Sequence, residues 1–281
     1  MNNQVSIQNL QKKAIQVRKD LVQMIYNSGE GHIGGSLSSV DILVSLYYRV
    51  MRIDPARPKW EDRDRFILSK GHSVEGYYAI LADLGFFPKD ELQNYRKFGS
   101  KLIGHPNNKI NGVEVNTGAL GHGLSIGVGM ALGGKMDKKE YRVYVLMGDG
   151  ELAEGSVWEA AMAGSNFGLD NLVGIIDRNK LQISGNTENV MKLEDLRERW
   201  SSFGWKVIEV NGHDIGEIVD VFERLPLEKG RPHMVIAHTT KGKGISFMEN
   251  NHKWHHSVPN EQQFKQAMEE LDLMMKKVER L

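Results

Sequence analysis

Near the amino terminus, apolar residues recur every three or four positions, which is the spacing of an amphipathic helix. The positions are Leu10, Ala14, Val17, Leu21, Met24 and Ile25. Gly29 interrupts this pattern and predicts the end of the helix. The stretch 38–51 predicts a second helix, with Ser38 as its N-cap.

Farther along, short runs of valine and isoleucine alternate with helical patterns. The runs that predict strands are 64–69, 141–147, 171–177, 205–210 and 232–239. The segments that predict helices are one ending at Gly85, one within 117–136, and 156–168, 193–204, 215–226 and 260–281. This alternation is typical of βαβ units, and nearly continuous apolar strands indicate a sheet that is covered on both faces.

We therefore predict an α/β fold, a parallel sheet with helices on both faces. The chain is expected to form a single domain over 1–281, with a helical extension over 1–28 and a terminal helix over 260–281. Within the helix predicted at 156–168, Trp158, Met162 and Phe167 are expected in the core.

Composition narrows the class of protein. The chain has 36 basic and 36 acidic residues, so no net field favours nucleic acid or an anionic membrane as a partner. It has no cysteine, which excludes disulfides and thiolate sites. The first residues lack the apolar core of a signal peptide, and no run approaches the ~18 apolar residues of a membrane span. We expect a soluble, cytoplasmic protein.

Polar residues and glycines follow four of the predicted strands, at 69–72, 148–150, 177–179 and 238–242. In a parallel sheet, ligands bind outside the carboxyl ends of the strands. Asp149 and Asn179 are oxygen ligands suited to Mg²⁺ or Ca²⁺, with a ligand's phosphates completing the shell. Gly148 and Gly150 would let a diphosphate approach the backbone.

A surface turn is the alternative for 148–150, because Asp-Gly after a strand is common there. Alone, the motif favours the turn; together with Asp177, Arg178 and Asn179 at the next strand end, it favours a metal–diphosphate site. No G-x-x-x-x-G-K-[ST] motif is present, and no G-x-G-x-x-G follows the first strand, so a bare nucleotide-binding domain lacks support.

The stretch "GDGELAEG…IIDRNK" resembles the thiamine diphosphate motif, which begins with GDG and ends in paired asparagines 25 to 30 residues on. "GHIGGSLSSVDIL", "LSKGHS", "GHP", "TGALGHGLSIGVGMAL" and "AHTTKGKGISFMENNHKWHH" are similar to the diphosphate-binding, amino-terminal portion of transketolases. The resemblance runs from about Gly29 to Pro259 in the family's order. It implies thiamine diphosphate and Mg²⁺ as cofactors, with Ca²⁺ or Mn²⁺ as substitutes, and transfer of a two-carbon ketol unit between sugars.

The resemblance also implies roles for individual residues. The metal ligands would be Asp149, Asn179 and the carbonyl oxygen of Leu181. The cofactor-binding residues would be His72, Gly118, Leu120, Gly148, Asp149, Gly150, Glu154, Asn179 and His255. Glu154 would join a network between the two cofactor sites of a dimer. The residues that orient the substrate and relay protons would be His32, His72, His105 and His255.

Several alternatives stay open. Lys241 in "TTKGKG" either contacts phosphate or faces water. The family shows Trp-His-Gly where this chain has Trp254-His255-His256, so the site histidine is expected at His255. Arg178 replaces the first paired asparagine, and His122 replaces a glutamine close to the site. A structural role is the expectation for His122, His213, His233 and His252.

A transketolase has further domains after the region matched here, including a pyrimidine-binding domain with a glutamate that contacts the cofactor. The resemblance therefore implies a two-subunit enzyme in which a separate carboxy-terminal subunit supplies that domain. A heterotetramer with two copies of each subunit is expected, acting on ketose phosphates or related anionic ketoses, in the pentose phosphate pathway or a specialised one. The rivals are another thiamine diphosphate enzyme, such as a deoxyxylulose-phosphate synthase or an oxo-acid decarboxylase, and a non-catalytic module of the same fold.

Overall fold

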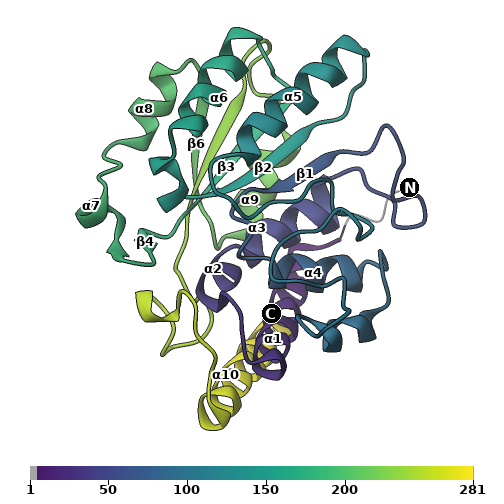
Figure 1. Cartoon of the computed structure of the whole chain (residues 1–281), viewed down its shortest axis with the longest axis vertical. Coiled ribbons are helices and arrows are strands. Elements are labelled where there is room, and N and C mark those ends of the chain that lie inside the picture. Colours follow the sequence, from purple (N-terminus) through teal and green to yellow (C-terminus); the bar gives the residue numbers. More distant parts are fainter. Residues whose placement is uncertain (1–4, 281) are drawn as a thin grey trace.

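A five-stranded parallel sheet forms the centre of the molecule in the computed structural model, which describes residues 5–280 (Figure 1). The strands are β1 (Arg65–Leu68), β2 (Val143–Gly148), β3 (Leu172–Arg178), β6 (Lys206–Asn211) and β7 (His233–His238). Their order is β1-β2-β3-β7-β6, and every neighbouring pair is parallel. Every residue of the central strand β3 is buried, as the continuous apolar run predicted.

Helices cover both faces of this sheet, so the predicted fold class is confirmed. On one face lie α5 (Gly123–Met136), α6 (Gly155–Asn166) and α8 (Leu196–Ser202), over a core that includes Val145 and Ile176. On the other lie α1 (Ile7–Ser28), α3 (Val40–Ser45), α4 (Glu75–Asp83) and α9 (Ile215–Glu223), over a core that includes Leu146 and Ile175. Successive strand residues thus face opposite layers.

The amino-terminal helix α1 belongs to the core that includes Leu146 and Ile175. Its Leu10 and Leu21 are fully buried, and Gly29 ends it with a φ of 71°. The carboxy-terminal helix α10 (Glu261–Glu279) packs along α1 and begins with a capping box between Asn260 and Gln263. Within residues 5–280, no helix combines the length and the apolar character that crossing a membrane requires.

The helix predicted over 38–51 is wrong at its start. The chain forms α2 (Ile33–Ser38), then α3, then a wide helical turn η1 (Leu46–Val50). Ser38 therefore ends a helix and is not an N-cap. Its hydroxyl donates to the buried Asp177 carboxylate at 2.6 Å and also lies 3.0 Å from Gly35 O, so it does not cap a helix start.

Two further expectations fail on the surface. Met162 and Phe167 were expected in the core, but they are 56% and 50% exposed, whereas Trp158 is half-buried against Trp200.

The sequence pattern was too short to predict a hairpin of β4 (Leu181–Gln182) and β5 (Gly185–Asn186), which is followed by α7 (Thr187–Val190). Short helical turns complete the chain: η2 (Lys89–Asn94), η3 (Gly150–Ala153) and η4 (His252–Trp254).

Candidate active site at the carboxyl edge of the sheet

A cavity of about 300 Å³ lies where the carboxyl ends of β1, β2 and β3 meet the loop after β7. Its walls are His32, Gly35, Lys70, His72, Ser73, Gly118, Leu120, Gly148, Asp149, Gly150, Glu151, Asn179, Leu181, Gln182, Ile183, Lys241 and His255. A larger cavity, of about 520 Å³, includes Arg52, Asp64 and Arg142 near the start of the strands, away from all the motifs above. Size therefore does not identify the site, and the chemistry of the walls does.

Most of the predicted site residues come together here. Those that line the cavity are His32, His72, Gly118, Leu120, Gly148, Asp149, Gly150, Asn179, Leu181 and His255. His105 lies just behind the wall, since a Cβ on Gly118 would stand 3.0 Å from its ring. Glu154 is exposed at the start of α6 and does not line the cavity.

The three expected metal ligands follow β2 and β3. Asp149 Oδ1 accepts from Gly150 N at 2.8 Å, and Asn179 Oδ1 accepts from Leu181 N at 3.1 Å. Leu181 O accepts from Lys241 Nζ at 3.1 Å. Among residues 5–280, no group of three or more His, Cys, Asp or Glu side chains could hold a metal. One carboxylate, one amide oxygen and one carbonyl oxygen would need ligands from outside the chain, which is how Mg²⁺ binds when phosphates and water complete its shell.

Two buried lysines also line the cavity. The sequence motifs assigned no role to Lys70 and left the role of Lys241 open. Lys70 and Lys241 are each 2% exposed. Lys70 Nζ donates to Gly35 O at 2.8 Å and forms an ion pair with Asp177. Burial, together with the charge of Lys70, lowers the pKa of Lys241 to about 8. Lys241 therefore does not face water, and both ammonium groups are placed to meet an anion in the cavity.

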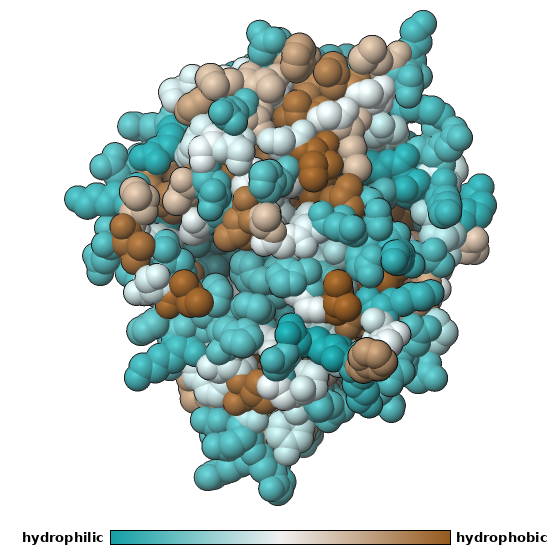
Figure 2. Space-filling view, viewed as in Figure 1, coloured by the Kyte–Doolittle hydropathy of each residue, from teal (hydrophilic) through white to brown (hydrophobic). Residues whose placement is uncertain are grey.

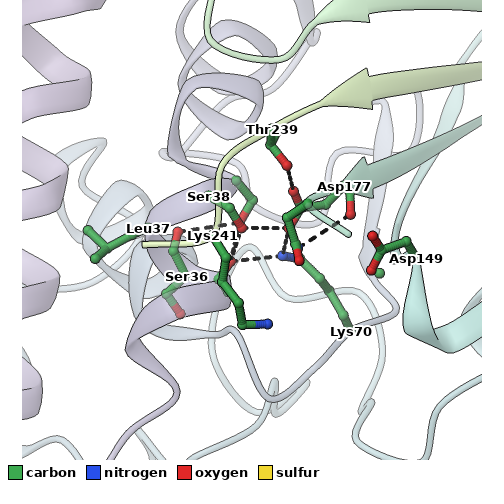
Figure 3. Close-up of polar contacts among 12 residues, drawn as sticks. Ser36, Leu37, Ser38, Lys70, Asp149, Asp177, Thr239 and Lys241 are labelled. Atoms are coloured by element: carbon green, nitrogen blue, oxygen red, sulfur yellow. Dashed lines mark hydrogen bonds and ion pairs between the residues drawn. The ribbon is translucent and has the colours of Figure 1, made fainter. Parts of the chain in front are cut away.

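Asp177 forms hydrogen bonds with several residues around the cavity (Figure 3). Its fully buried carboxylate accepts from Lys70, from Ser38 at 2.6 Å, from Thr239, and from Asn179 Nδ2 at 3.2 Å. Burial alone would raise its pKa, but the charge and hydrogen bond of Lys70 and the two hydroxyl donors lower it. One carboxylate thus fixes a cationic wall residue and an expected metal ligand.

Histidine rings form the opposite wall. The ring centroids of His32 and His72 are 5.1 Å apart, those of His72 and His255 are 5.3 Å apart, and those of His32 and His255 are 5.6 Å apart. Burial is the largest cause of a lowered pKa in all three: to about 4 for His32, to about 3 for His255, and well below the usual value for His72. At neutral pH each ring is uncharged and offers one donor and one acceptor.

Glu151 was left without a role by the sequence, yet it lines the cavity and is 2% exposed. Its carboxylate accepts from Ser69 Oγ, from Gly121 N at 2.9 Å and from Gly148 N at 3.1 Å. Burial raises its pKa, although these donors act against that shift. Glu151 ties the glycine-rich loop before α5 to the end of β2.

The three departures from the family pattern lie in different places. Arg178 does not line the cavity itself but donates to Asp149 Oδ2 at 3.2 Å and to Glu188 at 2.7 Å. His122 is exposed and does not line the cavity. His256 lies at the mouth, with its ring 4.5 Å from that of His32.

The walls fit a polar, anionic ligand such as the diphosphate of thiamine diphosphate. Buried atoms without any hydrogen-bond partner include His32 Nδ1, His255 Nδ1 and Ser73 Oγ, all from wall residues. A Cβ on Gly148 would meet no protein atom closer than 3.7 Å, so the missing side chain leaves room for the ligand. Lys241, whose ammonium has no carboxylate of residues 5–280 in an ion pair with it, supplies positive charge for a diphosphate.

The chain is similar to known proteins along nearly its whole length. The family profile described as "Transketolase, thiamine diphosphate binding domain" matches residues 10–278. One subunit of the apulose-4-phosphate transketolase of Phocaeicola vulgatus is 50% identical over 276 residues, which cover 98% of this chain and 98% of that protein. The 6-deoxy-6-sulfo-D-fructose transketolase subunit SqwG of Clostridium sp. is 42% identical over 264 residues, 94% of this chain and 96% of that protein.

Among solved structures, the transketolase of Campylobacter jejuni superimposes with a TM-score of 0.88 at 31% identity. The match covers 96% of this chain and 45% of that chain, so this chain spans less than half the length of that enzyme.

Proposed function

The chain belongs to the transketolase family, and from that premise we propose that it is the amino-terminal, diphosphate-binding subunit of a two-subunit transketolase. The observation that carries the proposal is the cavity, which is lined together by Asp149, Asn179, Leu181, Lys241 and the three histidines. The relatives named as transketolase subunits have nearly the same length as this chain, which supports the same division of labour here.

In the proposed site, Mg²⁺ is held by Asp149, Asn179 and the carbonyl oxygen of Leu181, and Ca²⁺ or Mn²⁺ would take the same ligands. Lys241 would supply positive charge to the diphosphate, whereas the charge of Lys70 is already balanced by Asp177. The backbone at 148–150 approaches it closely, because glycines at both ends leave no side chain in the way. When bound, thiamine diphosphate supplies the electron sink for breaking and making the carbon–carbon bond of the sugar.

Four histidines are proposed to handle the substrate. His32, His72 and His255 are neutral at pH 7 and have a free ring nitrogen or an open face toward the cavity. A neutral imidazole both donates and accepts, so these rings can orient sugar hydroxyls and move protons between them. His105, behind Gly118, would complete the set once a substrate extends past the cofactor.

A partner subunit is proposed to cover the open side of the cavity. Helix α5 contains only one charged residue, Lys135, yet just six of its fourteen residues are buried. Such a helix is normally covered. Met162 of the neighbouring helix α6 is also exposed, and Figure 2 shows apolar side chains gathered over the part of the surface where α5 lies. At the cavity rim, Ile183 is 65% exposed.

We therefore propose that a separate carboxy-terminal transketolase subunit, carrying the pyrimidine-binding domain, docks on this side. Two copies of each subunit would form a heterotetramer in which the exposed Glu154 lies near the interface. The substrate would be a ketose phosphate or a related anionic ketose. The proteins named for apulose 4-phosphate and 6-deoxy-6-sulfo-D-fructose support that class, since both names describe anionic ketoses.

The test is reconstitution. The purified chain is assayed for ketol transfer with thiamine diphosphate, Mg²⁺ and a panel of phosphorylated and sulfonated ketoses, with and without the carboxy-terminal subunit. We expect no transfer by either protein on its own and transfer by the mixture. Turnover by this chain without the partner would overturn the two-subunit proposal.

A further inference from the structure

The loop after β7 carries Lys241 into the cavity, and contacts on both sides of this residue hold the loop. Thr240 N donates to His213 Nε2 at 2.8 Å, and Gly242 N donates to Gly34 O at 3.0 Å. Arg18 Nε donates to Lys243 O at 3.2 Å. The ammonium of Lys241 reaches its place only if the backbone of 240–243 keeps this path.

Behind the loop, three side chains that the proposed chemistry does not use form a connected row. Arg18 grips Asp41 with two hydrogen bonds, from Nη1 at 2.9 Å and from Nη2 at 2.7 Å. His213 Nδ1 lies 2.7 Å from Asp41 Oδ2. Arg18 and Asp41 are 2% and 5% exposed, and they come from α1 and α3. His213 follows β6, so the row joins three elements that are far apart in the sequence.

The hydrogen bonds fix the protonation state of the imidazole. Because a backbone N–H can only donate, Nε2 of His213 must accept and carries no proton. The ring proton is therefore on Nδ1, where it points at Asp41. Burial would raise the pKa of Asp41, but Arg18 and the hydrogen bond from His213 lower it to about 2, so Asp41 is an anion that selects this tautomer.

We propose that Arg18, Asp41 and His213 are positioning residues that hold the backbone of 240–243 so that the Lys241 ammonium faces the diphosphate. They touch neither cavity nor ligand, and they act through the loop: the imidazole anchors Thr240 N–H, and the guanidinium anchors Lys243 O. The identity of the ligand rests on the proposed function, whereas the clamp itself rests on the contacts of this chain.

Two variants of His213 each keep one of the two hydrogen bonds of its ring. In His213→Asn the short amide can still donate to Asp41 but does not reach Thr240. In His213→Gln the longer amide oxygen takes the place of Nε2 and still accepts from Thr240 N–H. Hydrogen exchange of the free chain reports the clamp at the amide of Thr240. Calorimetry of thiamine diphosphate with Mg²⁺, on the chain assembled with its partner subunit, reports its consequence.

We expect His213→Asn to lose the protection of the Thr240 amide and about tenfold in cofactor affinity, and His213→Gln to retain most of both. Lys241→Met supplies the reference. Since His213 acts through Lys241, the double variant should bind the cofactor no more weakly than Lys241→Met alone.

The proposal is overturned if His213→Asn leaves the Thr240 amide protected, if it loses protection without losing affinity, or if the two variants' effects on affinity add. A wild-type complex that binds no thiamine diphosphate would refute the proposed function, and the exchange result would then decide the clamp by itself.

Discussion

Replacing Asp177 by asparagine should destabilise the protein strongly, because it leaves a buried ammonium without its counter-charge. The side chains of Asp177 and Lys70 are 0% and 3% exposed. Asparagine has the same shape but no charge and replaces one acceptor oxygen by an NH₂ donor, so the Lys70 ammonium would lose its counter-charge and keep only neutral acceptors such as Gly35 O. Removing one member of a buried ion pair costs about 3–5 kcal/mol.

Urea unfolding of the free chain measures this cost, followed by the fluorescence of tryptophans such as Trp200 and Trp205, which are almost fully buried. The midpoint should fall while the slope stays constant, since the same surface is exposed on unfolding. The double variant Asp177→Asn, Lys70→Met also removes the unpaired ammonium, so it should recover about 1 kcal/mol or more of the lost free energy of unfolding. Asp220→Asn is the control: its pair with Arg224 is exposed on both sides, so stability should change by less than about 0.5 kcal/mol.

The reasoning would be refuted if Asp177→Asn changed the free energy of unfolding no more than the Asp220→Asn control. It would also be refuted if the double variant were less stable than Asp177→Asn, because relief of the stranded charge is the stated cause.

Further predictions concern other parts of the site. Glu151→Gln should lower the free energy of unfolding by about 1–3 kcal/mol in the same urea assay, because its amide NH₂ would face backbone donors. The contribution of His32 and His255 to the stability of the free chain should be fully present above pH 6.5 and should decline toward pH 4, since both rings stay neutral when folded but gain protons when unfolded; thermal scans across this range would show it. His255→Gln should reduce the loss of unfolding free energy between pH 6.5 and pH 4 by on the order of 1 kcal/mol, and an unchanged loss would contradict the lowered pKa of His255. Met162→Lys should leave the melting temperature of the free chain almost unchanged, because this side chain is exposed. It should lower the fraction of the chain that sediments as a complex with the partner subunit, and full assembly would argue against the proposed docking side.

The sheet was predictable because strands covered on both faces must be apolar throughout. The five runs of valine and isoleucine correspond to the five strands of the central sheet, shifted by one or two residues at their ends. Helix starts were harder. Ser38 has the side chain of an N-cap, but its hydroxyl is taken by Asp177, a partner 139 residues away that no local pattern reveals.

The cavity was predictable where glycines and acids punctuate strand ends, as at 148–150. Lys70 and Lys241 were not, because a lysine in a polar loop normally faces water, and only the fold shows that these two are buried among carboxylates. Met162 misled for the opposite reason. An apolar residue at helical spacing predicts a core position equally well whether the core belongs to one chain or lies between two.

The central claim is that this cavity binds thiamine diphosphate through its diphosphate and a divalent cation. Calorimetric titration of thiamine diphosphate into the complex with its partner subunit, in the presence of Mg²⁺, tests it most directly. We expect one site per copy of this chain, at least tenfold weaker binding in Asp149→Asn or after removal of the metal, and no comparable binding of thiamine without the diphosphate. Equal binding of thiamine and thiamine diphosphate, or affinity that survives both Asp149→Asn and metal removal, would contradict the account.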